Sequence, residues 1–251
     1  MNHEATGLAG VRHIAYETLG STNAEALVLA RAGERGPLWV TAQSQTAGRG
    51  RRGSQWVSPR GNLYATLLLS EPASPDRVPQ LSFVAALAVH DAVVACAPQL
   101  GPVLNVKWPN DLLAKQAKVA GILIEGESDP RFTVVIGFGV NCATHPVDTS
   151  YAATSLAKAG AVVAPDALLA PLSDAMQRRL AQWNSGRNFA ATRADWLKRA
   201  SGLGQMLHVR LPERELSGRF EGLDDAGRLL LEQGGKVTAI TAGEVFGFSE
   251  H

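Results

Sequence analysis

A short segment rich in glycine and arginine is the first candidate for chemistry in this 251-residue sequence. Three glycines alternate with three arginines, in the order Gly48, Arg49, Gly50, Arg51, Arg52, Gly53. Glycine lets a backbone approach a ligand closely, and the planar fork of arginine binds phosphate or carboxylate groups. The segment therefore predicts a loop that binds a polyphosphate, although the same residues also suit nucleic acid or a solvated basic loop.

The glycines of this loop also match the GxGxxG spacing of dinucleotide-binding folds. That motif requires a helix that opens at the third glycine. Residues 54–61 contain Pro59 and predict a continuing loop instead. We therefore exclude a Rossmann-type site at this position.

Further polar residues stand at the ends of apolar segments downstream. Lys107, Asn110 and Asp111 flank a Trp-Pro pair at a predicted turn, and they suit phosphate and Mg²⁺, which prefers oxygen ligands. Lys118 opens an apolar strand that carries Gly121 three residues later, where the missing side chain permits a ligand to lie against the sheet. The alternative is an ordinary turn with a half-buried tryptophan and a strand with an exposed lysine.

The elements that must position these residues follow from hydrophobic spacing and turn signals. A capping-box pattern, with Thr22 at the N-cap and Glu25 three residues on, predicts a helix that Gly33 ends. Short links between the downstream strands favour antiparallel pairing, with a hairpin tip at 115–116. Strands are predicted at 38–42, 63–69, 103–107, 111–114, 119–125 and 132–140, and helices at 76–97, 165–183 and 189–200.

The pattern changes after Gly202. Five short strands separated by turn residues follow, and such a series indicates a small barrel. They are predicted at 205–211, 214–223, 228–231, 237–240 and 244–248. We therefore predict two domains, residues 1–202 and 203–251.

Composition limits the classes of function. Lys and Arg number 24 against 23 Asp and Glu, and this net charge of +1 gives no bulk attraction toward nucleic acid or a membrane surface. Cys96 and Cys142 lack metal-ligand spacing, so neither a zinc site nor a disulfide framework is expected. No signal-peptide pattern is visible, and His90 and Asp91 interrupt the apolar tract 83–97. We expect a cytoplasmic protein without a membrane partner.

Five motifs, taken in order, resemble those of the biotin protein ligase family. They are Ser21-Thr22-Asn23 and residues 45–53, 107–111, 118–123 and 137–141. The resemblance implies an α+β fold, with a mixed-sheet catalytic domain related to class II aminoacyl-tRNA synthetases and a small SH3-like β-barrel after it. It also implies an enzyme that uses MgATP to convert biotin into biotinyl-5′-AMP, with release of pyrophosphate. Biotin would then pass to a lysine of a biotin carboxyl carrier protein.

The same resemblance implies which residues form the site. Lys118, Lys107, Arg51 and Asp111 are expected to be catalytic, with Lys118 at the biotin carboxylate and α-phosphate, and Asn110 and Asp111 as the metal ligands. Arg49 is expected to close over the phosphates together with Arg51. The residues expected to bind biotin, ATP or both are Ser21, Thr22, Asn23, Gln45, Gly48, Arg49, Gly50, Arg51, Arg52, Trp56, Lys107, Asn110, Lys118, Gly121 and Asn141.

Some alternatives stay open at this point. A lipoate or octanoate ligase or transferase would share the implied fold, and a nucleic-acid-binding module would use the arginine-rich loop. Because the first motif lies near residue 21, we expect the family form that lacks an N-terminal DNA-binding domain, and hence no DNA partner. A monomer and a homodimer are both compatible with the sequence. The family's C-terminal Gly-Gly-Glu pattern is only partly present at Gly243-Glu244, since no arginine follows it.

Overall fold

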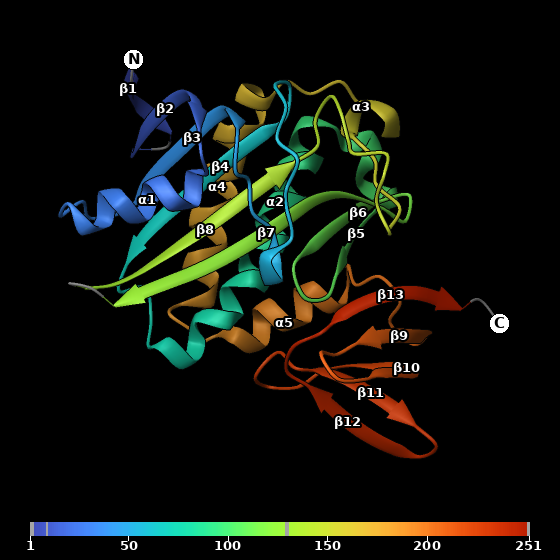
Figure 1. The fold of residues 1–251 in the computed structure, drawn as a ribbon. Helices are drawn as coiled ribbons and strands as arrows, with labels where there is room; N and C mark the ends of the chain where they lie inside the picture. The colour runs from blue at the N-terminus through green and yellow to red at the C-terminus, as the bar shows by residue number, and fades with distance from the viewer. Residues whose placement is uncertain (1–2, 9, 129–130, 250–251) are drawn as a thin grey trace.

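The larger of two sheets has eight strands and carries most of the residues singled out above (Figure 1). The computed structural model describes residues 3–8, 10–128 and 131–249. All neighbouring strands pair antiparallel except β2 and β3, so the predicted antiparallel pairing downstream is confirmed. Strands β1 and β2 were not predicted from the sequence. The strand order is β1 (His3–Leu8), β2 (Val11–Leu19), β3 (Leu38–Gln45), β4 (Leu63–Ser70), β8 (Phe132–Val140), β7 (Ala117–Ser128), β6 (Asp111–Ala114), β5 (Leu104–Lys107).

Helix α1 (Thr22–Arg31) makes the crossover that the parallel pair β2–β3 requires. Its N-cap is Ser21, whose backbone is extended, so the predicted N-cap at Thr22 is wrong by one residue. The backbone N–H of Thr22 instead donates to Oε1 of Gln45 on β3, at 2.8 Å. A side chain from the neighbouring strand thus satisfies a donor that a cap residue usually serves. Gly33 follows the helix with φ +96°, as predicted.

Helices cover the two faces of the large sheet unequally. Helix α1 packs over β3, β4 and β8, while α2 (Leu81–Cys96), α4 (Pro165–Trp183) and α5 (Phe189–Leu197) gather on the other face (Figure 1). The short helix α3 (Leu156–Ala159) follows the loop after β8. The predicted helix at 76–97 begins late because Pro79 lies in a 3₁₀ turn, Pro75–Gln80, that precedes α2. Similarly, α5 ends three residues before the predicted 200.

Helix α2 is apolar on all sides because it runs through the core. The stretch Pro75–Cys96 is long and apolar enough to cross a membrane by length and composition, but 61% of an apolar 18-residue part of it is buried inside the structure. A helix that is hydrophobic all round and covered by other elements is a core helix. Its burial supports the sheet edge formed by β5, β6 and β7, which α2 contacts.

The five predicted C-terminal strands form a second, antiparallel sheet. They are β9 (Met206–Arg210), β10 (Glu215–Leu223), β11 (Leu229–Gln233), β12 (Lys236–Ile240) and β13 (Glu244–Ser249), in the order β12-β11-β10-β9-β13. The result agrees with the expected mixed-sheet domain followed by a small barrel-like domain. The exact boundary between residues 202 and 203 stays a prediction.

The turn between β10 and β11 fastens the second domain to the first. The indole Nε1 of Trp108 donates to the carbonyl oxygen of Gly227 at 3.2 Å. Gly227 has φ +81°, and a Cβ built there would lie 2.7 Å from Cε2 of Phe83. Only glycine meets both conditions, since an L side chain would be strained and would also collide with the core. The turn that carries Trp108 is therefore braced from the C-terminal domain.

We predict that Gly227→Ala lowers the free energy of unfolding by more than the matched change Gly234→Ala. Both glycines have positive φ, but a Cβ at Gly234 would meet nothing within 4 Å. Backbone strain alone predicts a loss of about 1–2 kcal/mol at Gly234, and the collision at Gly227 adds about 1–3 kcal/mol. Urea denaturation of both variants measures the difference, and equal losses would show that the junction tolerates a side chain.

Candidate active site

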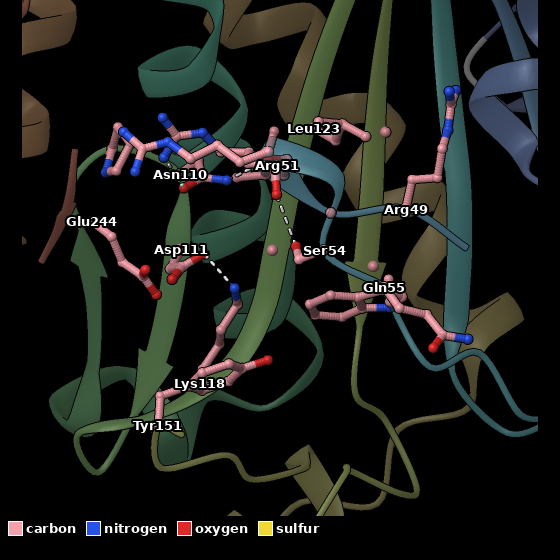
Figure 2. A pocket seen from close by; sticks show the side chains of 18 of the residues that line it. Arg49, Arg51, Ser54, Gln55, Asn110, Asp111, Lys118, Leu123, Tyr151 and Glu244 are labelled. Carbon is pink, nitrogen blue, oxygen red and sulfur yellow. Dashed lines mark hydrogen bonds and ion pairs between the residues drawn. The ribbon is translucent and has the colours of Figure 1, made fainter. Parts of the chain in front are cut away.

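A cavity of about 590 Å³ lies on the α1 side of the large sheet, beside the start of that helix. Its walls come from the arginine-rich loop, the β5–β6 turn, strands β7 and β8, residues 149–151 and the turn at 243–245 (Figure 2). Nearly all of the predicted site residues line it. Those that do are Ser21, Thr22, Asn23, Gln45, Arg49, Gly50, Arg51, Arg52, Trp56, Lys107, Asn110, Asp111, Lys118 and Gly121.

Two predicted residues stand outside the lining. Asn141 is buried, and its Nδ2 donates to the carbonyl oxygen of Thr154 at 3.0 Å, so its side chain holds the loop after β8. Gly48 leaves room for the loop to fold back on itself, since a Cβ there would lie 3.1 Å from Nε2 of Gln45 and closer still to Trp56 and Ser58. Both residues shape the cavity from behind its wall.

Lys118 and Lys107 converge on a single carboxylate, that of Asp111. The Nζ of Lys118 lies 2.8 Å from Oδ1 (Figure 2), and the Nζ of Lys107 lies 3.4 Å from Oδ2. These three side chains are 10–17% exposed. Two cations sharing one anion in a partly buried pocket leave an excess positive charge, which suits an anionic ligand.

A β-bulge brings Lys118 into the cavity. In a regular strand, residues three apart point to opposite faces, so Lys118 would point away from Gly121. The β6–β7 register instead shifts between Leu112, which pairs with Ala120, and Leu113, which pairs with Lys118. The extra residue, Val119, turns into the core, and Lys118 and Gly121 share the pocket face.

The ammonium group of Lys118 also lies between two aromatic rings. Its Nζ is 5.3 Å from the ring centroid of Trp56 and 5.2 Å from that of Tyr151. Both distances fall within the range of cation–π attraction. The segment that carries Tyr151 is tied to the lysine's own backbone, because the N–H of Lys118 donates to Ala152 and the N–H of Thr154 donates to Lys118. Tyr151 was not predicted from the sequence, because no motif marks it.

Arg51 connects the arginine-rich loop to the C-terminal domain. Its Nη1 donates to Oδ1 of Asn110 at 3.3 Å and to the carbonyl oxygen of Gly243 at 3.4 Å. Burial lowers the pKa of Arg51, the adjacent charge of Arg52 lowers it further, and Asp111 and Glu244 act in the opposite direction. Lys107 makes a parallel link, since its Nζ donates to the carbonyl oxygen of Val245 at 3.2 Å. The C-terminal turn thus completes the wall of the cavity.

The predicted metal ligands do not fit a directly bound Mg²⁺ in this arrangement. The Oδ1 of Asn110 accepts from Arg51 and its Nδ2 donates to the carbonyl oxygen of Ile122, while Asp111 is paired with two lysines. Among the described residues no group of three or more His, Cys, Asp or Glu side chains is placed to hold a metal ion. Magnesium commonly keeps several waters and is held largely by substrate phosphates, so a magnesium ion in this cavity would depend on the ligand's phosphates more than on these two side chains.

At the α1 end of the cavity, polar side chains that the resemblance assigns to ligand binding are hydrogen-bonded to one another. Thr22 Oγ1 donates to Gln45 Oε1 at 3.2 Å, and Thr66 Oγ1 lies 2.8 Å from Thr22 Oγ1 and 2.7 Å from Asn23 Oδ1. Gln45 Nε2 donates to Ser58 Oγ at 2.9 Å. The network fixes the orientation of each amide and hydroxyl before a ligand arrives.

Glycines on β7 and β8 make the floor of the cavity. Gly121 pairs with Gly139 across the two strands, and the indole ring of Trp56 lies on them. A Cβ at Gly139 would be 2.5 Å from the indole Nε1, and one at Gly121 would be 3.0 Å from Cζ3. The sequence analysis singled out Gly121 as a place where a ligand can lie against the sheet, and the flat indole explains why side chains are excluded at both glycines.

Comparisons of the sequence with known proteins identify similar families and relatives over most of the chain. Residues 21–141 match the biotin/lipoate A/B protein ligase family, and residues 202–246 match the biotin protein ligase C-terminal domain. A biotin–[acetyl-CoA-carboxylase] ligase of Paracoccus denitrificans is 43% identical over 235 residues, which cover 90% of this chain and 96% of that protein. The corresponding Mycobacterium tuberculosis ligase is 36% identical over a stretch that covers 90% of this chain and 85% of that protein.

Solved structures show the same likeness. The biotin protein ligase of Aquifex aeolicus in complex with biotin and ATP has a TM-score of 0.80 at 24% identity, over 93% of this chain and 97% of that one. The Leishmania major ligase in complex with biotinyl-5-AMP has a TM-score of 0.63 at 27% identity, over 91% of this chain and 98% of that one. The first of these shares the fold, and the second adds sequence similarity to it.

We predict that Gly139→Ala lifts the indole of Trp56 off the sheet. The other four tryptophans, Trp39, Trp108, Trp183 and Trp196, are 0–3% exposed, so iodide quenching of tryptophan fluorescence reports mainly on Trp56. The quenchable fraction is expected to rise in this variant. In the control Gly126→Ala, a Cβ makes ordinary contacts at 3.6 Å and quenching should stay as in the wild type. Unchanged quenching in Gly139→Ala would show that the ring does not depend on this floor.

Proposed function

Because the chain belongs to the biotin/lipoate A/B protein ligase family, we propose that this cavity is where biotin and ATP react and where the activated biotin is passed on. The enzyme is an ATP-dependent biotin protein ligase, and its partner is the biotin carrier of acetyl-CoA carboxylase. The observation that carries the assignment to this cavity is that residues of all five motifs, which are far apart in the sequence, line it together with an excess of cationic side chains.

The first step joins two anions, and the cationic cluster supports it. A carboxylate is a poor acyl donor to an amine because its leaving group would be oxide, and attachment of AMP supplies a better leaving group. The carboxylate oxygen of biotin forms a bond to the α-phosphorus of ATP while the bond to pyrophosphate breaks. Lys118 faces the point where these charges meet, and Lys107 and Arg51 supply further positive charge beside it. Fixed cations of this kind stabilise developing negative charge without reorganisation.

The second step forms an amide bond between biotin and a lysine of the carrier, and AMP leaves. The attacking lysine must lose its proton. Asp111 faces the cavity from the start of β6 and is a candidate to orient that lysine. Tyr151, Trp56 and the arginine-rich loop surround the cavity and would keep water from the adenylate.

The recognition of biotin is assigned to the hydrogen-bonded network near α1. A ureido head carries two N–H donors and one carbonyl acceptor, and Ser21, Thr22 and Gln45 offer complementary groups. Both N–H groups of the Asn23 amide donate to protein partners, Glu125 and Leu123, whereas Nε2 of Gln45 donates to Ser58 alone and has a second N–H for a ligand. We therefore assign Asn23 to the shape of this end and the other three residues to ligand contact.

We also propose that the enzyme acts in the cytoplasm. Cys96 and Cys142 are both free thiols in the structure, and burial raises the pKa of Cys142 to about 11. Unpaired, unreactive thiols suit a reducing compartment.

An ATP–pyrophosphate exchange assay tests both the substrate and the role of Lys118. Biotin is expected to support exchange, whereas lipoate and octanoate are not. Lys118→Ala should lower the exchange rate by about 100-fold or more, because a charge aimed at the reacting oxygens is lost, while the circular dichroism spectrum stays unchanged. Exchange with lipoate alone would remove the biotin assignment, and normal exchange in Lys118→Ala would remove the lysine's role.

We predict that Arg51→Ala releases the adenylate early. Its guanidinium links the loop to Asn110 and to the C-terminal turn, and loss of charged hydrogen bonds of this kind changes retention by about tenfold. The measurement is labelling of lysines on a bystander protein in the absence of carrier. The conservative variant Arg51→Lys should leak less than Arg51→Ala, and equal labelling by the wild type and Arg51→Ala would contradict the prediction.

A further inference from the structure

Two of the three arginines in the loop, Arg49 and Arg51, point toward opposite ends of the cavity. Arg51 reaches toward Asn110, whereas Arg49 extends to the far side, away from Asp111 and Lys118 (Figure 2). There its Nη2 lies 3.0 Å from Oε2 of Glu125 on β7. The expectation that Arg49 closes over the phosphates beside Arg51 is therefore not met in this arrangement.

The ion pair is one of few ties between the tip of the loop and the sheet. Within the described residues, the backbone hydrogen bonds of segment 49–55 stay inside the loop, such as Gly50 N–H to Ser54 and Ser54 N–H to Arg51. The bonds that leave this segment come from the side chains of Arg49 and Arg51. Loss of either side chain should therefore loosen the tip without disturbing its internal structure.

Glu125 also bonds to Asn23, at the α1 end of the cavity where biotin is proposed to bind. The same oxygen, Oε2, accepts from Nδ2 of Asn23 at 2.8 Å, and Oδ1 of Asn23 accepts from Thr66 at 2.7 Å. One carboxylate oxygen thus connects the arginine-rich loop to the hydrogen-bonded network near α1, which is proposed to bind biotin. A movement of Arg49 or of Asn23 that displaces Glu125 therefore changes the hydrogen bond that the other residue makes to Oε2.

The ion pair between Arg49 and Glu125 is weak enough to break when the loop opens and to form again when it closes. The side chains of Arg49 and Glu125 are 45% and 28% exposed, and ion pairs with such exposure are worth little and are readily exchanged for water. Substrate entry and product release require the loop to open, and a weak tie permits this while favouring the closed state.

We propose that Glu125 is a positioning residue that ties closure of the arginine-rich loop to the biotin end of the cavity, through Arg49 and Asn23. The proposal rests on the proposed function for its link to biotin. The tie itself is a property of the ligand-free protein and can be tested separately. The chain also offers a matched control, because Glu127 lies two residues along β7 and pairs bidentately with Arg31 of α1, at 2.6 Å for both bonds.

Trypsin cleavage of the ligand-free protein tests the tie. The loop contains cleavage sites after Arg51 and Arg52, and mass spectrometry identifies the products. Cleavage there tracks the population of open loop. In Glu125→Gln this rate should rise about two- to fivefold, as expected for loss of a partly exposed ion pair. Glu127→Gln should leave it unchanged.

A second variant, Arg49→Gln, distinguishes loss of this ion pair from a general loss of structure in Glu125→Gln. Arg49→Gln removes the same pair from the loop side and should raise cleavage by a similar factor. The double variant should add little to either single change, because the two residues act through one contact. Cleavage in Glu125→Gln equal to the wild type, or a fully additive double variant, would overturn the proposal.

Retention of biotinyl-AMP by enzyme preloaded with biotin and ATP tests the link to biotin. Glu125→Gln should release the adenylate about two- to fivefold faster, with a smaller change in the KM for biotin, because glutamine still accepts from Asn23. Glu125→Ala should raise that KM as well. Equal shifts in the two variants would overturn the link. If the wild type forms no biotinyl-AMP, the proposed function fails, whereas the trypsin comparison still decides the tie.

Discussion

The arrangement of this protein depends on holding several like charges close together. Lys118 and Lys107 share the carboxylate of Asp111, and Arg51 lies at the edge of the same cavity. Without Asp111, these cations would repel one another in a partly buried site and would need water to separate them. Each comes from a different piece of the chain, namely β7, the end of β5 and the arginine-rich loop. The sheet therefore has to place β5 and β7 so that both lysines reach one acid, while Asn110 next to that acid holds Arg51.

Space for the ligand comes from side chains that are missing. Gly121 and Gly139 face each other across β7 and β8, and the indole of Trp56 covers them. Larger residues there would fill the hollow and push the loop outward. The stability that glycine costs inside a strand is offset by the long apolar run of β8 and by the buried helix α2 behind the sheet.

The sequence predicted the elements that carry strong patterns and missed those that depend on distant partners. The alternating strands, the glycine-rich loop and the five C-terminal strands are confirmed, because each has local spacing and turn residues of its own. The N-cap was misplaced because Gln45, more than twenty residues away, satisfies the N–H of Thr22. The pocket orientation of Lys118 depends on a bulge, which one unpaired residue creates only once β6 and β7 are paired. Tyr151 and the divergence of Arg49 from Arg51 are likewise set by tertiary contacts that leave no mark on local spacing.

The contacts of the C-terminal turn have an evolutionary consequence. Lys107 and Arg51 both bond to main-chain carbonyl oxygens, those of Val245 and Gly243. Every amino acid presents the same carbonyl, so selection at these positions acts on the path of the backbone more than on side-chain identity. A substitution of Val245 can therefore change the side chain at this turn and leave the bond from Lys107 in place, provided that the backbone keeps its path.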